Sequence, residues 1–266
     1  TMLDEIVISA SRTPERIFES PVSVERFGIK EIKNTTAPSF YGGLQNLKGV
    51  DIITNSLTFN SVNTRGFAAF ANNRFLQLVD GIDNQSPGLN FALGNLVGIN
   101  ELDVSSVEIL PGASSALYGA GAFNGILFLT GKNPFDSQGI SFYAKTGLTS
   151  QVAAGDNGYY DIGIRAAHAF SDKFAAKVNF SFLQGEDWHA NSTVDNLNPG
   201  LTRTDPNFDG LNIYGDEVTT LLNFDALAGL PTGTVGSANV SRTGYLEEDL
   251  VNYQAQSVKT DFSLHY

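Results

Sequence analysis

The residues best spaced for chemistry lie in a long polar stretch around residue 205. Oxygen-bearing side chains recur at positions 1, 3, 5 and 12 of one window: Asp205, Asn207, Asp209 and Asp216. This spacing, with Gly210 at the sharp turn, imitates a calcium-binding loop. Asp at position 12 and Pro206 at position 2 depart from that pattern. A calcium site and a turn-rich polar loop therefore both stay open.

Motifs for catalysis are incomplete. Gly119-x-Gly121-x-x-Asn124 lacks the last glycine of a dinucleotide fingerprint, and Gly112-Ala-Ser-Ser-Ala116 lacks that of a nucleophile elbow. The three histidines are too widely spaced to form a local metal pair: His168, His189 and His265. Cysteine chemistry is excluded because the chain has no cysteine. We therefore expect that the protein is not an enzyme, and no cofactor is indicated besides the calcium above.

The charge balance excludes another class. Asp and Glu number 28 against 16 Lys and Arg, a net charge of −12 over 266 residues. Without a basic cluster there is no electrostatic attraction for nucleic acid, so nucleic acid is not an expected partner. The longest apolar runs, such as Ile126–Leu129, are far shorter than the roughly 20 residues of a membrane-spanning helix. Any bilayer contact would be made by strands.

Two halves with different patterns must position these residues. Up to about Pro134 the sequence is typical of a mixed α/β domain. Apolar residues at i, i+4 and i+7 predict one helix between Ala37 and Gly49. Short apolar segments predict strands at residues 6–8, 22–24, 75–79, 104–110 and 126–130.

After Pro134 the pattern alternates with a period of two. Four runs are apolar on one face and polar on the other: residues 140–148, 160–170, 174–182 and 258–266. Their length, with a short turn at 171–173 and a long loop at about 184–250, favours the wall of a transmembrane β-barrel. A soluble β-sandwich, whose strands also alternate, is the other interpretation.

Six collinear motifs carry a resemblance to a known family. They are the segment 4–12 (DEIVISASR), Pro21–Val24, Leu44–Val50 (LQNLKGV), Asn63–Phe67 (NTRGF), Leu78–Gly81 (LVDG) and 104–132, which contains VEILPGASSALYG. In this order they resemble the plug region of TonB-dependent outer-membrane receptors. Pro111 departs from the family, which usually has a basic residue before the glycine.

The resemblance implies an α/β plug domain followed by antiparallel transmembrane β-barrel strands. Residues 1–12 would hold the TonB box and plug entry, residues 13–134 the plug, and residues 135–266 the N-terminal barrel strands with a long extracellular loop at about 184–250. Intact members of the family have a 22-stranded barrel, which needs about 220 residues before any loops. We therefore expect a partial barrel: an N-terminal portion of a receptor, a partly built receptor, or one chain of a split assembly.

The resemblance also implies roles for individual residues. The extended segment Asp4, Glu5, Ile6, Val7 and Ile8 would bind TonB by adding a strand to its sheet. Plug charges would latch the plug to the barrel wall as buried ion pairs: Arg65, Arg74 and Glu108.

Cargo should meet the outward loops of the plug. Amides beside aromatic rings suit a neutral polar small molecule, glycan or peptide, and the expected residues are Phe67, Phe70, Asn72, Asn73, Asn84, Gln85, Asn90 and Phe91.

We therefore expect a receptor of the bacterial outer membrane that takes up a nutrient by TonB-driven displacement of its plug. Its implied partners are TonB, outer-membrane lipids and the cargo, and a surface lipoprotein stays open. Two alternatives remain. One is a structural or interaction subunit of a cell-envelope assembly that transports nothing, and the other is a soluble α/β plus β-sandwich binding protein.

Overall fold

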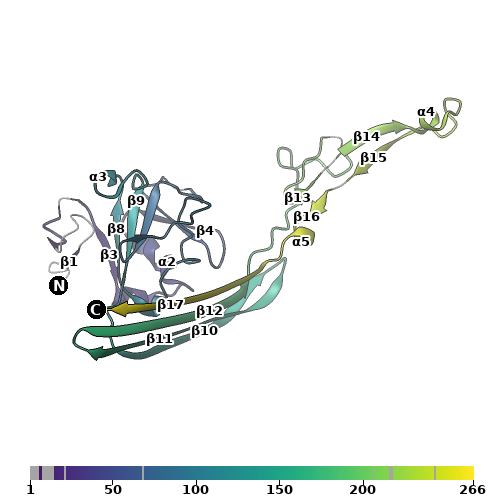
Figure 1. The fold of residues 1–266 in the computed structure, drawn as a ribbon. Coiled ribbons are helices and arrows are strands. Elements are labelled where there is room, and N and C mark those ends of the chain that lie inside the picture. Colours follow the sequence, from purple (N-terminus) through teal and green to yellow (C-terminus); the bar gives the residue numbers. More distant parts are fainter. Residues whose placement is uncertain are drawn as a thin grey trace. The chain divides into compact units, whose positions relative to one another are not determined.

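The computed structural model describes residues 6–7, 15–20, 22–67, 69–205, 207–215, 218–242 and 244–266. The chain divides into two compact units, which are described separately here (Figure 1). The first contains residues 1–149, 157–187 and 254–266, and the second contains residues 150–156 and 188–253. Within the described residues, no helix is both long and apolar enough to cross a bilayer.

A five-stranded mixed sheet forms the centre of the N-terminal half. Its strand order is β3-β8-β9-β6-β7. The strands are β3 (Glu25–Gly28), β6 (Phe75–Val79), β7 (Ile82–Asp83), β8 (Val104–Pro111) and β9 (Gly125–Gly131). β6 and β9 pair in parallel, whereas the other neighbours are antiparallel. The expected strands at 75–79, 104–110 and 126–130 are confirmed.

One face of this sheet carries the main hydrophobic core. Phe75, Val107, Ile109 and Leu127 are buried there against Phe40 and its neighbours. The remaining elements of this half are short: α1 (Ile29–Asn34), α2 (Phe40–Gly43), η2 (Leu44–Asn46), η3 (Glu101–Asp103), α3 (Ser115–Tyr118) and a separate hairpin of β4 (Val50–Thr54) and β5 (Asn60–Thr64).

The expected single helix at 37–49 is wrong. The chain forms α2, continues as η2 and is extended by Leu47. The chain packs closely at this point, because a Cβ at Gly43 would lie 2.5 Å from Oγ1 of Thr35 and 2.7 Å from Cζ of Phe27. The backbone therefore approaches β3 so closely that only glycine fits. The strand expected at 22–24 is also wrong, since β3 begins at Glu25.

Four long antiparallel strands follow the five-stranded sheet. That sheet, with the elements packed on it, is called the plug from here on. The long strands are β10 (Gly139–Gln151), β11 (Gly155–Ser171), β12 (Phe174–Glu186) and β17 (Gln254–His265), which lie in that order (Figure 1). Ser171 pairs with Phe174, so a tight turn joins β11 to β12. At the opposite end, the chain leaves β12 for the long segment and returns into β17. All four expected strands are confirmed.

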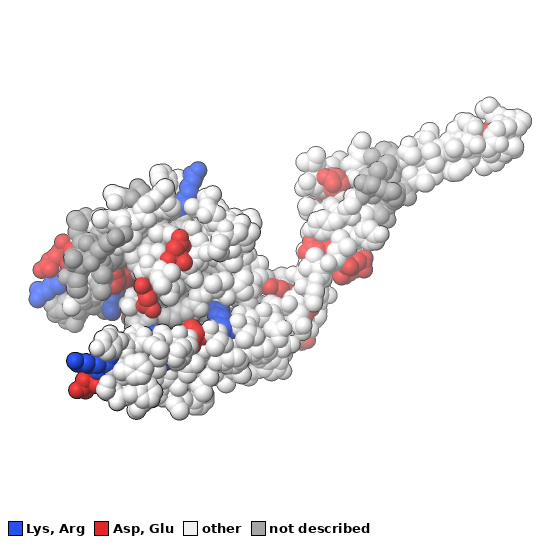
Figure 2. Space-filling model, viewed as in Figure 1, with Lys and Arg blue, Asp and Glu red and all other residues white. Residues whose placement is uncertain are grey.

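This sheet has the polarity of a membrane wall. Phe142 is 79% exposed and Phe262 is 65% exposed, and the apolar side chains of β11 and β12 also face outward. Arg165, Lys177 and Asn179, on the other face, are buried. A soluble sandwich would bury the apolar face, so that alternative is wrong. Figure 2 shows the side of this sheet turned to the viewer as largely uncharged.

The second unit is the long segment between β12 and β17. It contains β13 (Ile213–Tyr214), β14 (Val218–Asn223), α4 (Phe224–Ala228), β15 (Ser237–Arg242), β16 (Tyr245–Leu246) and α5 (Glu247–Leu250). β14 and β15 form a hairpin, and the Asp225 carboxylate organises its tip by accepting from the N–H groups of Gly233 and Val235 at 2.6 and 2.7 Å. These bonds lower the pKa of Asp225. The expected loop therefore has its own secondary structure.

The outward face gives a first testable prediction. Ile164 lies near the middle of β11 with its side chain outward, and Ile164→Arg places a charge in hydrocarbon. We expect a loss of about 2–4 kcal/mol in the free energy of unfolding measured in lipid vesicles. Ile164→Val is the control and should differ little from the original. An arginine variant as stable as the control would show that this face does not meet lipid.

Candidate functional site

The contact between plug and strands is organised around one buried carboxylate. Asp103, at the end of η3, accepts from Nε of Arg165 at 2.6 Å and from Nζ of Lys177 at 2.5 Å. The two cations come from β11 and β12, and all three side chains are almost completely buried. Each cation also donates to a backbone carbonyl: Arg165 to Ser137 at 2.9 Å and Lys177 to Lys132 at 3.1 Å. One plug carboxylate thus joins two neighbouring strands.

Local structure holds Asp103 in place. The side chain of Asn100 accepts from the N–H of Leu102 at 2.8 Å and so caps η3. The same side chain donates to the carbonyl of Phe180 in β12 at 3.1 Å. Lys132 donates from Nζ to the carbonyl of Leu102 at 2.6 Å. Burial lowers the pKa of Lys132, and the positive charge of Arg165 lowers it further.

A second polar contact lies beside the first, because its acidic residue, Glu101, is two residues before Asp103 in η3. Lys145 of β10 contacts Oε2 of Glu101 through Nζ at 2.7 Å and donates to the carbonyl of Pro38 at 3.0 Å. Asp161 of β11 lies 3.9 Å from the same Nζ and accepts from the hydroxyl of Tyr143 at 2.8 Å. Ion pairs therefore connect the plug to β10, β11 and β12, and Lys259 of β17 also donates to the carbonyl of Asn95.

The residues expected to form the latch are placed elsewhere. Arg65 and Arg74 are exposed and line a pocket made by the plug, and Glu108 is buried on β8 within the plug sheet. Among the ion pairs between described plug and strand residues, Asp103 and Glu101 supply the acidic partners. No sequence motif pointed to these two residues. A latch role for Arg65, Arg74 and Glu108 stays a prediction.

The expected cargo loops meet in an aromatic cluster. Phe70 and Phe91 have ring centroids 6.3 Å apart, and each lies about as close to Phe59, at 6.4 and 6.0 Å. Phe59 comes from the turn between β4 and β5, to which no sequence motif pointed. Three separate loops thus each contribute one ring.

Contacts with the strands show at which end of the sheet this cluster lies. Leu57, in the same turn as Phe59, donates its N–H to the carboxylate of Asp187 at 3.1 Å. Asp187 directly follows β12, where the long segment begins. Lys177 and Arg165 lie nearer the opposite end, which has the tight turn between β11 and β12. The Phe59 turn therefore lies at the end of the sheet from which the long connection leaves, and long connections face the outside in outer-membrane barrels.

The other expected cargo residues divide into exposed and structural ones. Phe67 is 75% exposed, and Asn73 is also exposed. Asn72 donates to the side chains of Asn63 and Asn124 at 2.6 and 2.7 Å and so connects strands within the plug. Asn84, Gln85 and Asn90 belong to the loop at 83–93 and support its conformation. Asn84 donates to the carbonyl of Val97, Gln85 donates to that of Phe75, and Asn90 has a φ of 57° that permits the turn.

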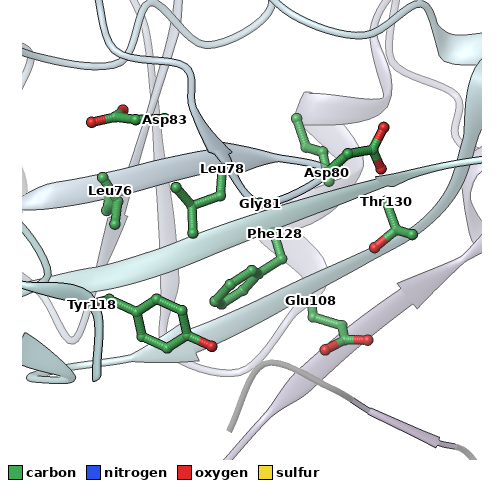
Figure 3. A pocket seen from close by; sticks show the side chains of 10 residues that line it. Leu76, Leu78, Asp80, Gly81, Asp83, Glu108, Tyr118, Phe128 and Thr130 are labelled. Atoms are coloured by element: carbon green, nitrogen blue, oxygen red, sulfur yellow. The ribbon is translucent and has the colours of Figure 1, made fainter. Parts of the chain in front are cut away.

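A groove of about 580 Å³ lies on the face of the plug sheet opposite the main core (Figure 3). Figure 3 shows Leu76, Leu78 and Phe128 along its floor and carboxylates near its ends. These carboxylates belong to Asp80, Asp83 and Glu108. Glu108 is thus the one expected latch residue in this groove.

The N-terminal strand packs on the same sheet face. β1 (Ile6–Val7) pairs with β2 (Glu15–Arg16), and Ile6 is 57% exposed. Val7 is fully buried in a cluster with Val24 and Leu110. The other residues expected to bind TonB, Asp4, Glu5 and Ile8, lie outside the described residues.

The expected calcium residues are not brought together by the described structure. The carboxylate of Asp205 accepts from the N–H and hydroxyl of Thr202 at 2.7 and 2.8 Å, and these bonds lower its pKa. The N–H of Asp209 donates to Asp195, Asn207 is exposed, and Asp216 lies outside the described residues. No group of three acidic or histidine side chains able to hold a metal ion occurs in the described part of the chain. Calcium stays a prediction without support here.

Comparisons with known proteins agree with this architecture. Residues 16–126 match the TonB-dependent receptor plug domain family. The vitamin B12 transporter BtuB of Vibrio vulnificus (strain CMCP6) is 24% identical over 200 residues, which cover 74% of this chain and 30% of the transporter.

Two solved structures share the fold. The ferric citrate transporter FecA, unliganded, has a TM-score of 0.55 at 18% identity over 66% of this chain and 27% of its own. The ferripyoverdine receptor of Pseudomonas aeruginosa has a TM-score of 0.50 at 13% identity over 81% of this chain and 32% of its own. The chain therefore spans about a third or less of the length of these proteins.

The fold and the charged contact together define a class of protein in which an α/β plug domain packs on the polar face of long antiparallel strands whose apolar side chains point outward. Residues 16–126 match the plug domain of TonB-dependent receptors, and the chain shares the fold of solved receptors such as FecA and the outer-membrane ferripyoverdine receptor. It contributes the plug domain and barrel strands.

Removal of the central carboxylate should release the plug from these strands. Asp103→Asn removes the carboxylate that pairs directly with the buried side chains of Arg165 and Lys177. We expect a cost of about 3–5 kcal/mol in plug docking, because one partner of a buried ion pair is lost. The measurement is the urea concentration at which the plug of the purified receptor becomes protease-sensitive. Asp136→Asn, at an exposed carboxylate, is the control. Equal midpoints for the two variants would contradict the assigned role of Asp103.

Proposed function

We propose that the chain acts in TonB-dependent active uptake of a nutrient across the outer membrane. Cargo binds at the outward loops of the plug, and TonB then displaces part of the plug by pulling on the N-terminal segment. The observation that carries this proposal is the polar contact between plug and strands, centred on Asp103. A transported nutrient needs no bond-breaking chemistry, so we infer uptake and not catalysis.

The polar contact supports displacement of the plug for an energetic reason. Charged groups that are buried between plug and strands regain hydration when they separate, which offsets part of the lost ion-pair energy. An apolar contact of the same area would expose its surface to water without such compensation. The contact of Asp103 with Arg165 and Lys177 is therefore specific when formed and still separable.

The N-terminal strand supports the proposed role of residues 4–8 as the segment on which TonB pulls. Strand addition to TonB uses main-chain hydrogen bonds, and β1 is already extended. Val7 is buried with Val24 and Leu110, so it must leave that cluster before residues 4–8 pair fully with TonB. We propose that cargo binding favours this release.

Main-chain pairing makes a sharp prediction for Ile6. Ile6→Pro removes the N–H needed for strand addition, and we expect at least tenfold weaker binding of the receptor to the periplasmic domain of TonB. The measurement is biolayer interferometry with the complete receptor in detergent.

Arg16→Pro is the matched control for that experiment. Arg16 pairs with Ile6 in the resting plug, so this change breaks the same β1–β2 pairing but leaves residues 4–8, the segment that would bind TonB, unchanged. TonB binding should be retained or strengthened. Undiminished binding by the Ile6→Pro variant would favour the alternative of an envelope subunit that transports nothing.

The aromatic cluster is the proposed contact for cargo. Phe59, Phe70 and Phe91 come from three loops at the outward end of the plug, and Phe70 is 59% exposed. Aromatic rings on separate loops can report an occupied site to the whole plug. The relatives are named for vitamin B12, ferric citrate and ferripyoverdine, so a small molecule is the first cargo class to test. A glycan or peptide, and a surface lipoprotein as a further partner, remain part of the proposal.

Loss of a ring should weaken cargo binding. We expect Phe70→Ala or Phe91→Ala to lower affinity about 5- to 30-fold, equivalent to roughly 1–2 kcal/mol of lost aromatic contact. The two effects should not add, because the rings touch one cluster. The measurement is a panel of labelled vitamin B12, ferric citrate and ferripyoverdine on whole cells. Phe18→Ala, which removes a ring that is 69% exposed elsewhere on the plug, is the control. A bound cargo whose affinity is the same in all three variants would contradict this site.

A further inference from the structure

A histidine lies on the outward face of the four long strands. His168 follows Ala166 and precedes Phe170 in the alternation of β11, so its imidazole belongs to the face with the polarity of a membrane wall. The side chain is exposed, and within the described part of the chain its ring nitrogens make no hydrogen bond. It meets the ring of Phe170 edge-on, with centroids 4.9 Å apart. A polar, ionisable group on a lipid-facing surface is costly unless it finds a polar partner.

The position of His168 along β11 places it near the edge of the apolar band. It is four residues from Ile164, near the middle of the strand, and four residues span about 13 Å. At a strand tilt of about 40° this is roughly 10 Å along the membrane normal, compared with about 12 Å from the centre of the band to its edge. The rings of Phe170 and Phe174 follow toward the tight turn and stack with centroids 5.5 Å apart. The imidazole therefore lies at the depth where acyl chains end and lipid headgroups begin.

A hollow of about 420 Å³ borders this imidazole. Its described lining combines residues with little or no side chain and large apolar ones: Gly139, Ala166 and Ala176, with Ile140, Phe170 and Phe262. Ala176 stands directly opposite His168 in the pairing of β11 with β12, so only a methyl group faces the imidazole there. Lys177 also borders the hollow, but its ammonium group is bound to Asp103 on the inner face. The hollow is thus apolar apart from the imidazole.

The partner of this imidazole has to come from the bilayer. The outward neighbours of His168 along and across the strands are Ala166, Phe170 and Ala176, which have no polar side-chain atom. A lysine or arginine reaches the headgroups along its own apolar stem. The imidazole is attached through a single methylene group, so it stays at the depth of its backbone. A lipid polar group must therefore approach it.

We propose that the hollow binds one phospholipid of the periplasmic leaflet. An acyl chain lies over the small residues, and a phosphate oxygen accepts a hydrogen bond from the imidazole of His168. The leaflet follows from the tight turn between β11 and β12, because short turns of outer-membrane barrels face the periplasm. The proposal requires the sheet to be a membrane wall, as the uptake function does, but it involves neither cargo nor TonB.

A specific site differs from the layer of lipid that covers any membrane wall. Lipids of that layer are held by apolar contact alone and exchange with detergent. A lipid in the hollow gains one hydrogen bond to a charged group and the contact area of a concave surface. It should stay bound when detergent replaces the others, and its retention should depend on the phosphate, on His168 and on the space beside Ala176.

Native mass spectrometry of the complete receptor tests these three dependences. The receptor is stripped of lipid in an uncharged detergent and titrated with dioleoyl phosphatidylglycerol, or with dioleoylglycerol, which lacks the phosphate. We expect one retained phosphatidylglycerol per receptor and at least tenfold weaker retention of dioleoylglycerol. His168→Leu, which keeps the face apolar, should weaken retention of phosphatidylglycerol at least tenfold.

His265→Leu is the matched control. This histidine lies on the inner face of β17, with Nε2 3.2 Å from Oγ of Ser263, and its replacement should change retention less than twofold. Ala176→Phe fills the hollow with an apolar ring and leaves His168 in place. We expect it to weaken retention at least tenfold as well, so the test stays decisive if His168→Leu disturbs the strands.

Several outcomes would overturn the proposal. One is no retained phosphatidylglycerol on the original receptor, and another is equal retention of the two lipids. A third is retention that His168→Leu or Ala176→Phe leaves unchanged, which would assign the lipid to the general layer on the wall. Failure here leaves the uptake function untouched, because the Ile6→Pro experiment tests that function without lipid. The Ile164→Arg experiment tests separately whether the face meets lipid at all.

Discussion

The structure depends on a reversal of the usual polarity of a sheet. The four long strands turn their apolar side chains outward, so their charged side chains must find partners on the inner face. Arg165 and Lys177 cannot remain buried without counter-charges, because an unpaired ion in a protein interior costs several kcal/mol. Asp103 meets this requirement for both cations at once. The plug is therefore an electrostatic complement of the wall as well as a domain with its own core.

Two kinds of packing follow from this constraint within one compact unit. The plug sheet is sealed on one side by a conventional apolar core around Phe75 and Leu127, which keeps the domain folded. Its contact with the strands is polar, through Asp103 and Glu101. Under the proposed uptake mechanism, such a division would let the plug separate from the wall without losing its own core. A transport mechanism that moves the plug needs this combination.

The candidate site was predictable in part. Cations at Lys145, Arg165 and Lys177 fall on the polar face of three strands in the alternating pattern, and this implies acidic partners on the plug. Sequence could not select Asp103 and Glu101 from the other plug carboxylates, because the choice depends on how η3 meets the wall. Phe59 was missed for a similar reason, since the β4–β5 hairpin has no clear alternation.

The sequence by itself determined the class of protein. A period-two pattern survives any tertiary arrangement because successive side chains of a strand always point to opposite faces, and the collinear motifs from residue 4 to 134 indicated the family. Tertiary structure alone decided which face is buried, which carboxylate joins plug to wall, and that small residues of separate strands leave a hollow beside His168. These are contacts between segments distant in sequence. Their geometry follows from packing, in which backbone approaches such as that at Gly43 leave no local signature.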